Sequence, residues 1–234
     1  MIYLEANFEL TKQVYKAFLE SKAKKIIFFS SVKAVADSIE GVLDERVSPN
    51  PKTHYGISKR KAEIFINSQE NNEKQFYILR PCMIHGENNK GNLNLLYKLI
   101  ANRIPWFLGS FDNRRSFLSV DNLAFIVKEI MTKKIPSGEY FLADDKSFST
   151  NQLVKLIGES LCKKVTIINL PKYFVLKLAI FGDFFKLPLN SERLNKLTEN
   201  YVVDNSLIKK ALNKELPIST IEGLKKTFKS FNIN

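Results

Sequence analysis

Tyr55 and Lys59 are the residues of this chain whose types and spacing could perform acid/base chemistry. They lie four residues apart in the segment PNPKTHYGISKRKAE, so a helix there places both side chains on one face. A tyrosine with a pKa of about 10 keeps its proton at neutral pH and becomes a base only if its pKa falls. A neighbouring ammonium favours the phenolate, and lowering the pKa by about 3 units corresponds to about 4 kcal/mol. The pair therefore predicts a proton-transfer site.

The same spacing occurs a second time, at Tyr173 and Lys177. With eight tyrosines in a lysine-rich chain, such a pair is expected by chance. The second pair lies inside the apolar segment KYFVLKLAIF and follows no strand that ends in hydroxyl residues, whereas Tyr55 follows the strand-like segment KIIFFSS. We therefore interpret Tyr173 and Lys177 as a coincidence and assign the chemistry to the helix that begins at Tyr55.

Ser31 is the candidate third member of the site. It ends the strand-like segment 24–31, and doubly wound sheets bind ligands at the carboxyl ends of their strands. Its hydroxyl could hydrogen-bond a reacting oxygen and orient it toward Tyr55. The alternative is a strand-end serine that satisfies loop backbone, which is also how we interpret Ser30.

The elements that must position these residues alternate along the first third of the chain. Apolar spacing predicts a helix over residues 9–22, and an apolar run predicts a buried strand over 24–31. A second helix begins near Tyr55, and a second strand follows over 75–80. This order is typical of an α/β fold with a parallel, doubly wound sheet.

Beyond Pro81 the pattern becomes mixed, which predicts a smaller second α/β lobe. A helix is expected over 92–100, helices begin near residues 121 and 149, and the last helix opens with Ser219 and Glu222 at capping-box spacing. Short strands are expected over residues 104–109, 115–120 and 138–144. We place the boundary so that residues 1–90 form the doubly wound part with Tyr55 and Lys59 and residues 91–234 mainly the smaller lobe.

Composition narrows the class of protein. The net charge of +12 suggests an anionic partner, but the lysines are scattered and form no arginine-rich block, so we expect no nucleic-acid binding. Cys82 and Cys162 stand alone, which excludes a disulfide framework and a zinc site of ordinary spacing. We expect a cytoplasmic protein with no metal, no signal peptide and no membrane partner. The apolar stretch 173–189 is interpreted as a helix packed on a core, with a membrane or partner contact as the alternative.

Several ordered motifs together resemble the extended short-chain dehydrogenase/reductase family, specifically its NAD-dependent epimerase/dehydratase group. They are SSVK, PNPKTHYGISKRKAE, LRPCMIHG, NRRSFLSVDNL and SGEYFLADD. The resemblance runs from Asn7 to the last helix. It implies a Rossmann-like fold, NAD or NADP as the cofactor, and a nucleotide sugar as the substrate.

The resemblance also implies roles for individual residues. Tyr55 would exchange a proton with a sugar hydroxyl, and Lys59, with Tyr55 and Pro81, would lie against the cofactor. Asn92 and Arg115 match family residues that contact the sugar diphosphate, for which a guanidinium is well suited.

Each further match has a plainer alternative. For Asn92 the alternative is a helix cap. For Arg115 the alternatives are that the neighbouring Arg114 contacts the diphosphate instead, or that either arginine is a surface charge. Asn7 matches a family asparagine that supports the site, with a helix cap as its alternative. For His54 and His85, the sequence indicates no partner for general-base catalysis or metal binding.

The resemblance most favours a UDP-sugar 4-epimerase. An NAD(P)H-dependent reductase of a UDP-4-keto-6-deoxy amino sugar is the close alternative, because the same pair serves both reactions. A third reading, from another class, is an inactive fragment or interaction protein. The helices near 8–22 and 56–69 resemble those through which relatives dimerise, which makes a homodimer a further expectation.

The glycine-rich phosphate loop of the family has no counterpart here. The nine glycines are dispersed, and no three fit the fingerprint that lets a backbone approach a pyrophosphate. In the family, the first strand, the glycine loop and further strands precede the region that begins at Met1. We therefore expect this chain alone to bind NAD(P) weakly or not at all, an edge of the sheet to be exposed, and an N-terminal polypeptide to complete the cofactor site.

Overall fold

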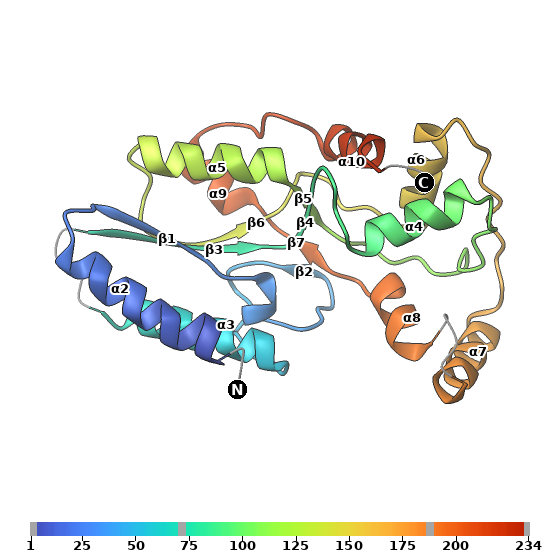
Figure 1. The fold of residues 1–234 in the computed structure, drawn as a ribbon, viewed down its shortest axis with the longest axis horizontal. Coiled ribbons are helices and arrows are strands. Elements are labelled where there is room, and N and C mark those ends of the chain that lie inside the picture. The colour runs from blue at the N-terminus through green and yellow to red at the C-terminus, as the bar shows by residue number, and fades with distance from the viewer. Residues whose placement is uncertain (1–3, 70–73, 186–189, 232–234) are drawn as a thin grey trace.

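A three-stranded parallel sheet forms the centre of the molecule in the computed structural model, which describes residues 4–69, 74–185 and 190–231 (Figure 1). Its strands are β1 (Lys25–Phe29), β3 (Gln75–Pro81) and β6 (Gly138–Leu142), in the order β1-β3-β6. Figure 1 shows helices on both faces of this sheet. The predicted α/β class with a parallel sheet is confirmed.

Alternation along β3 explains the two helical layers. Ile78 packs with Tyr15 and Phe18 of α2 (Leu10–Glu20) and with Ile66 of α3 (His54–Asn67). Its neighbours Tyr77 and Leu79 belong to the core on the other face, which is covered by α5 (Val120–Thr132) and α9 (Ser206–Leu212). Successive strand side chains point to opposite faces, so one strand holds α3 and α5 in fixed positions.

All of the predicted elements except the strand over residues 104–109 are found near their expected places. The first helix is preceded by a π-helical turn, η1 (Glu5–Glu9), and β1 is followed by a 3-10 turn, η2 (Val32–Ala34). The remaining predicted helices are α4 (Asn92–Ala101), α6 (Thr150–Ser160) and α10 (Thr220–Lys229), and Ser219 and Glu222 form the predicted capping box.

The sequence interpretation was wrong for residues 104–109, which are not a regular strand. Trp106 and Leu108 form only isolated bridges, to Ile167 and Asn169. The short strands that do form are β2 (Val42–Leu43), β4 (Met83–His85), β5 (Phe117–Ser119) and β7 (Val202–Val203), paired in parallel as β2-β7 and β4-β5.

Strand β6 lies in the central sheet although it follows residue 91 in sequence. It pairs in parallel with β3 over the register Tyr77 with Gly138 to Pro81 with Leu142. Helix α5 makes the crossover that a parallel pair requires. Residues 91–234 therefore contribute to the central sheet as well as to a second hydrophobic core.

A second core lies beside the sheet and holds the other helices. Side chains of α4, α6 and α10 meet there around Leu96, Val154 and Phe228, and α7 (Lys172–Phe184) and α8 (Ser191–Thr198) each contribute to it. In Figure 1, α7 and α8 lie at the end of the molecule away from β1. Within the described residues, β1 pairs only with β3, and its side chains are only partly buried.

Candidate active site

The first turn of α3 presents Tyr55 beside the loop that follows β1. Thr53 caps this helix by accepting a hydrogen bond from the backbone N–H of Gly56 (3.2 Å). A Cβ at Gly56 would lie 2.3 Å from the carbonyl oxygen of Lys33 and 2.9 Å from Cβ of Pro51. Glycine is thus required next to Tyr55 because the helix backbone approaches η2 so closely.

Lys59 is held one turn later at the carboxyl end of β1. Its Nζ donates a hydrogen bond to the backbone carbonyl of Phe29 (2.8 Å) and lies 5.0 Å from the centre of the Phe28 ring. Burial lowers the pKa of Lys59. The ammonium is therefore positioned at the strand end by the backbone rather than by a neighbouring carboxylate.

The side chain of Ser31, two residues after the end of β1, forms a hydrogen bond with the backbone of η2. Its Oγ accepts a hydrogen bond from the backbone N–H of Lys33 (3.2 Å), as the plainer alternative expected. The hydroxyl proton is not used by that bond, so the group can still donate to a ligand. Because Ser31 and Gly56 both contact Lys33, η2 brings the serine strand and the start of α3 together.

Asn7 supports the same helix from the other side. Its Nδ2 donates to Oγ of Ser58 (3.1 Å), and that hydroxyl donates to the backbone carbonyl of Tyr55 (2.8 Å). Asn7 lies inside η1, so the helix-cap alternative is wrong. Ser58 was missed in the sequence, where only its place one turn after Tyr55 could have signalled it.

A buried ion pair fixes the middle of α3 to the sheet. Glu63 is fully buried and accepts two hydrogen bonds of 2.8 Å from the guanidinium of Arg80 on β3. It also accepts one from Oγ of Ser30 (2.6 Å) and pairs with Arg60 (3.0 Å). Ser30 is therefore structural, as interpreted. This fork of charged hydrogen bonds orients α3, and with it Tyr55 and Lys59.

Asp37 anchors the loop that leads into α3. Its carboxylate accepts hydrogen bonds from the backbone N–H groups of Lys52 and Thr53 and from the Thr53 hydroxyl (2.7 Å). Burial alone would raise the pKa of Asp37, but these hydrogen bonds outweigh it and lower the pKa below its ordinary value. The cap residue of α3 is thus itself held in place.

Asn92 lies apart from the residues above, at the first turn of α4. It lines a cavity of about 270 Å³ between α4, the segment 104–108 and α8. Its side chain does not cap the helix. Most of the wall is apolar, formed by Leu95, Leu99, Ile104, Pro105, Trp106, Phe107, Leu108 and Leu197, and two cations, Arg193 and Lys196, come from α8.

Arg115 contacts the backbone of α8 beside this cavity. Its guanidinium donates to the backbone carbonyl of Lys196 and lies 3.6 Å from the Glu199 carboxylate. Burial lowers the pKa of Arg115. Arg115 does not itself line the cavity. Arg193 and Lys196, which do, were missed in the sequence, although their spacing of one helical turn could have signalled a common face.

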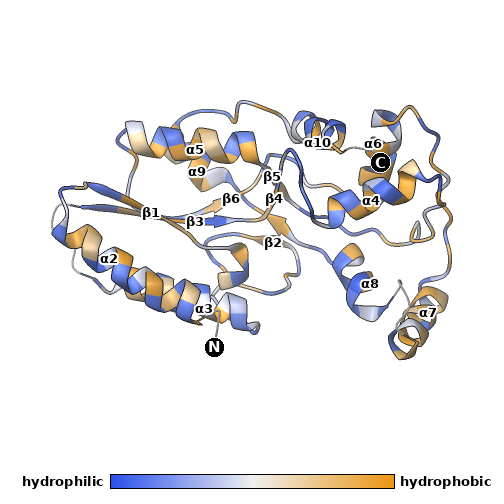
Figure 2. Ribbon diagram, in the orientation of Figure 1, coloured by the Kyte–Doolittle hydropathy of each residue, from blue (hydrophilic) through white to orange (hydrophobic). Residues whose placement is uncertain are grey.

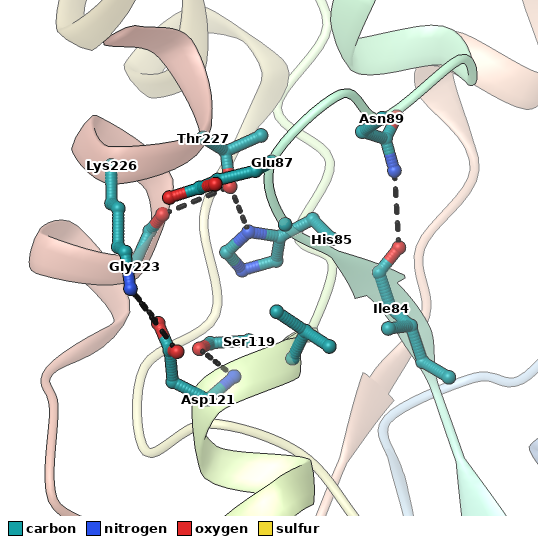
Figure 3. Close-up of a pocket in the computed structure, with 11 residues that line it drawn as sticks. Ile84, His85, Glu87, Asn89, Ser119, Asp121, Gly223, Lys226 and Thr227 are labelled. Atoms are coloured by element: carbon teal, nitrogen blue, oxygen red, sulfur yellow. Dashed lines mark hydrogen bonds and ion pairs between the residues drawn. The ribbon is translucent and has the colours of Figure 1, made fainter. Parts of the chain in front are cut away.

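Pro81 is the last residue of β3, at its carboxyl end, and His85 is the last residue of β4. Pro81 is buried and aligned with Leu142 of β6. His85 is buried beside a separate hollow of about 410 Å³, where Figure 3 shows it between Ser119 and Thr227. Its Nδ1 lies 2.9 Å from the Thr227 hydroxyl and its Nε2 3.6 Å from Asp144, partners that sequence reasoning did not provide.

The described residues limit the kinds of site present. They contain no group of three or more His, Cys, Asp or Glu side chains that could hold a metal ion. None of their helices has the length and apolar character needed to cross a bilayer.

Comparison with known proteins decides the family. The model of the NAD dependent epimerase/dehydratase family matches residues 2–143, which include Tyr55, Lys59 and Ser31. The chain belongs to this family. Its recognition from the sequence motifs, and NAD as the cofactor that the family uses, are thereby confirmed.

Two curated relatives of this epimerase/dehydratase chain are 4-epimerases. It is 28% identical to the UDP-glucose 4-epimerase of Vibrio cholerae over 98% of the chain and 70% of that relative. It is 32% identical to the N-acetyl-alpha-D-glucosaminyl-diphospho-ditrans,octacis-undecaprenol 4-epimerase of Escherichia coli O157:H7, over 89% of the chain and 62% of that relative. The chain therefore spans about two thirds of the length of these relatives.

The fold is shared with a solved UDP-glucose 4-epimerase from Thermotoga maritima, determined with UDP-glucose. The TM-score is 0.72 at 18% sequence identity, covering 97% of this chain and 69% of that one. This likeness confirms the Rossmann-type α/β architecture.

Proposed function

We propose that this chain carries the catalytic and sugar-binding parts of an NAD-dependent 4-epimerase of diphosphate-linked sugars. The observation that carries the proposal is the position of Lys59, with Nζ on the carbonyl of Phe29 at the carboxyl end of β1, one turn from Tyr55. Residues 1–90 supply the proton-transfer groups in this proposal, and residues 91–234 mainly supply the sugar-diphosphate site.

The residues of this chain divide the work at C4 of the sugar. Tyr55, as the phenolate, accepts the proton of the C4 hydroxyl and later returns it. Lys59 stabilises the phenolate by its positive charge. Ser31 donates a hydrogen bond to the C4 oxygen and holds it near Tyr55. Bound NAD, held beside Tyr55, Lys59 and Pro81, would supply a reversible hydride acceptor for C4.

The residues present fit one half of the cofactor better than the other. Tyr55, Lys59 and Pro81 lie at or beside the carboxyl ends of β1 and β3, where a nicotinamide ribose would be held. The nine glycines offer no phosphate fingerprint, so the pyrophosphate must be held by other groups. An N-terminal polypeptide that supplies such a loop remains part of the proposal.

The cavity beside Asn92 fits the diphosphate end of the substrate. Arg193 and Lys196 provide positive charge at its rim, and the apolar wall offers contact for an apolar or aromatic group. Arg115 acts here by holding the backbone of Lys196. A UDP-sugar is the first candidate, as in the Vibrio cholerae relative. A polyprenyl-diphosphate sugar is the second, since the cavity wall is largely apolar and the Escherichia coli relative is named for such a substrate.

A turnover assay separates the proposed reaction from its alternatives. The purified chain is incubated with NAD in excess and UDP-N-acetylglucosamine or UDP-glucose, and the product is followed by proton NMR. A 4-epimerase forms the C4 epimer with no net accumulation of NADH. Net consumption of NAD(P)H with a 4-keto sugar would instead identify the reductase.

The inactive-fragment alternative needs a separate control. NAD binding is titrated in the same preparation, and turnover is scored only at concentrations at which the titration shows occupancy. Occupied chain that forms no product would refute the epimerase. Addition of a polypeptide encoded upstream, where one supplies a strand and glycine loop, tests whether the cofactor site is shared.

A homodimer through α2 and α3 is the proposed assembly. Leu10 and Val14 of α2 and Ile64 of α3 are about half exposed, although all three are large and apolar. Such side chains on neighbouring helices are suited to an isologous contact. Sedimentation of the chain with and without Val14→Glu measures it.

A further inference from the structure

Helix α7 carries an unusual distribution of side chains. The residues that face the protein are the small ones, Val175, Ala179 and Gly182, spaced as one helical stripe. The large apolar residues face outward. These exposed residues are Tyr173, Phe174, Leu176, Leu178, Ile180, Phe181 and Phe184, followed by Phe185 just after the helix.

This pattern is the reverse of an ordinary surface helix, whose large apolar residues face the core and whose polar residues face water. Phe184 is 83% exposed and Ile180 is 64% exposed. The rings of Phe181 and Phe185 are in contact, tilted by 38° with their centres 4.3 Å apart, which gathers the apolar groups into one patch. Patches of this kind mark surfaces that contact a partner or a membrane.

The charges around the patch are positive. Helix α7 has two lysines, Lys172 and Lys177, and one acidic residue, Asp183. The Asp183 carboxylate accepts a hydrogen bond from the backbone N–H of Ser191 (2.9 Å), which directs it toward α8. Lys177 lies over the ring of Tyr173, with Nζ 4.4 Å from the ring centre. Lys172, at the first turn, lies over the ring of Phe111, with Nζ 5.7 Å from the ring centre. The exposed surface of α7 thus combines apolar side chains with cations and no acidic group directed outward.

We propose that the outward face of α7 is a docking surface for an anionic phospholipid bilayer. The helix is too short to span a membrane but suits a position in the plane of the interface, with its aromatic and aliphatic side chains among the acyl chains. Lys172 and Lys177 then contact the anionic headgroups. This departs from the sequence expectation of no membrane partner, because apolar periodicity does not distinguish a core-facing stripe from a lipid-facing one.

Charge favours a bilayer over a second copy of the chain on this face. Two copies that met through α7 would bring together the same lysines in a protein of net charge +12. An anionic surface instead attracts both the lysines of α7 and the excess positive charge of the whole chain. Figure 2 shows apolar residues along α7, which lies at the end of the molecule away from β1 and clear of the central sheet.

The docking surface does not depend on the proposed chemistry. Tyr55 and Lys59 lie on α3, on the central sheet, whereas α7 packs on the second core and against α8. Vesicle binding and sugar epimerisation can therefore fail separately. When both hold, the cavity between α4 and α8 lies beside the lipid surface, which suits a lipid-linked sugar.

Sedimentation of the full chain with vesicles tests the proposal. Vesicles of phosphatidylcholine alone are compared with vesicles that also contain about a quarter phosphatidylglycerol, an anionic lipid. The double variant Ile180→Glu/Phe184→Glu should bind the anionic vesicles roughly tenfold more weakly than the unmodified chain. Met131→Glu on α5 is the matched control, because Met131 is 64% exposed like Ile180, and it should bind unchanged.

Three results would overturn the proposal. They are no binding of the unmodified chain to anionic vesicles, equal binding by the double variant, or equal loss in Met131→Glu. Analytical ultracentrifugation tests the remaining alternative, in which a second copy of the chain binds this face. If the unmodified chain self-associates, fails to bind vesicles, and becomes monomeric in the double variant, the face belongs to a second copy. Thermal melts of all variants confirm that only the surface was changed.

Discussion

The two tyrosine and lysine pairs of this chain have identical spacing and opposite surroundings. On α3, Lys59 reaches the backbone of Phe29 and burial lowers its pKa. On α7, Lys177 lies over the ring of Tyr173, which is itself two-thirds exposed. The helix of the first pair is fixed to the sheet by Glu63. Spacing alone therefore identifies candidate tyrosine and lysine pairs, whereas a catalytic pair must also be held in place, as Lys59 is at the end of β1.

Removal of the phenol gives the largest expected difference between the pairs. Tyr55→Phe removes the proton-transfer group and should lower turnover by about a thousandfold. Tyr173→Phe is the matched control and should keep full turnover, since its hydroxyl plays no part in the reaction. Both are measured by the epimerase assay at saturating NAD. Full activity in Tyr55→Phe would contradict the assignment.

The anchoring of α3 is tested by Glu63→Gln. The substitution leaves the guanidinium of Arg80 with only the partly exposed Glu139 as a charged partner and should lower the free energy of unfolding by about 3 kcal/mol. Urea denaturation measures the loss. Glu192→Gln on α8 also removes one partner of an ion pair, with Lys196, but an exposed one. Glu192→Gln should leave the urea midpoint unchanged. If it lowered the free energy of unfolding as much as Glu63→Gln does, α3 would not be more firmly anchored than α8.

The close approach of α3 to η2 is tested by Gly56→Ala. Its Cβ would meet the Lys33 carbonyl oxygen, so the first turn of α3 must shift, at a cost of about 2 kcal/mol. Turnover should fall by more than the loss of folded protein alone would cause, because Tyr55 moves with that turn. The control is Gly91→Ala, whose Cβ would come no closer than 3.2 Å to Asn89. If Gly56→Ala keeps wild-type turnover, Tyr55 does not need that exact placement.

The smallest effect concerns the loop ahead of Tyr55. Asp37→Asn replaces a carboxylate that holds Lys52 and Thr53, and should cost about 1 kcal/mol at neutral pH. The folded pKa of Asp37 is lowered, so its contribution is present above the unfolded value of about 4 and is lost as pH falls through the folded value. The stability gap between wild type and variant should therefore close in acid. A gap that stays constant throughout would contradict this role.

Local patterns were enough to predict the helix and strands that carry the proposed catalytic residues. The apolar run of β1, the hydroxyl residues at its end and the helix beginning near Tyr55 lie within about one α/β unit, where periodicity and turn residues are informative. The outer bounds of α3 and β3 followed from the same patterns. Ser30 as a structural residue also agreed, because a serine facing the helix side of the strand end can reach Glu63.

Features that depend on distant pairs were not predictable in this way. The fork between Glu63 and Arg80 joins residues of separate elements, and nothing in either segment identifies its partner. The return of β6 to the central sheet is a non-local pairing of the same kind. Arg193 and Lys196 were missed because their helix lies about a hundred residues from Asn92, across the cavity they share.

The central claim is that this chain moves a hydride off C4 of a sugar and back to it, with Tyr55 exchanging the hydroxyl proton. It is tested most directly with UDP-N-acetylglucosamine that carries deuterium at C4, incubated in ordinary water with the chain at NAD concentrations at which the binding titration shows occupancy. The account predicts a C4 epimer that retains its deuterium, with no net NADH. Loss of the deuterium to solvent would contradict it.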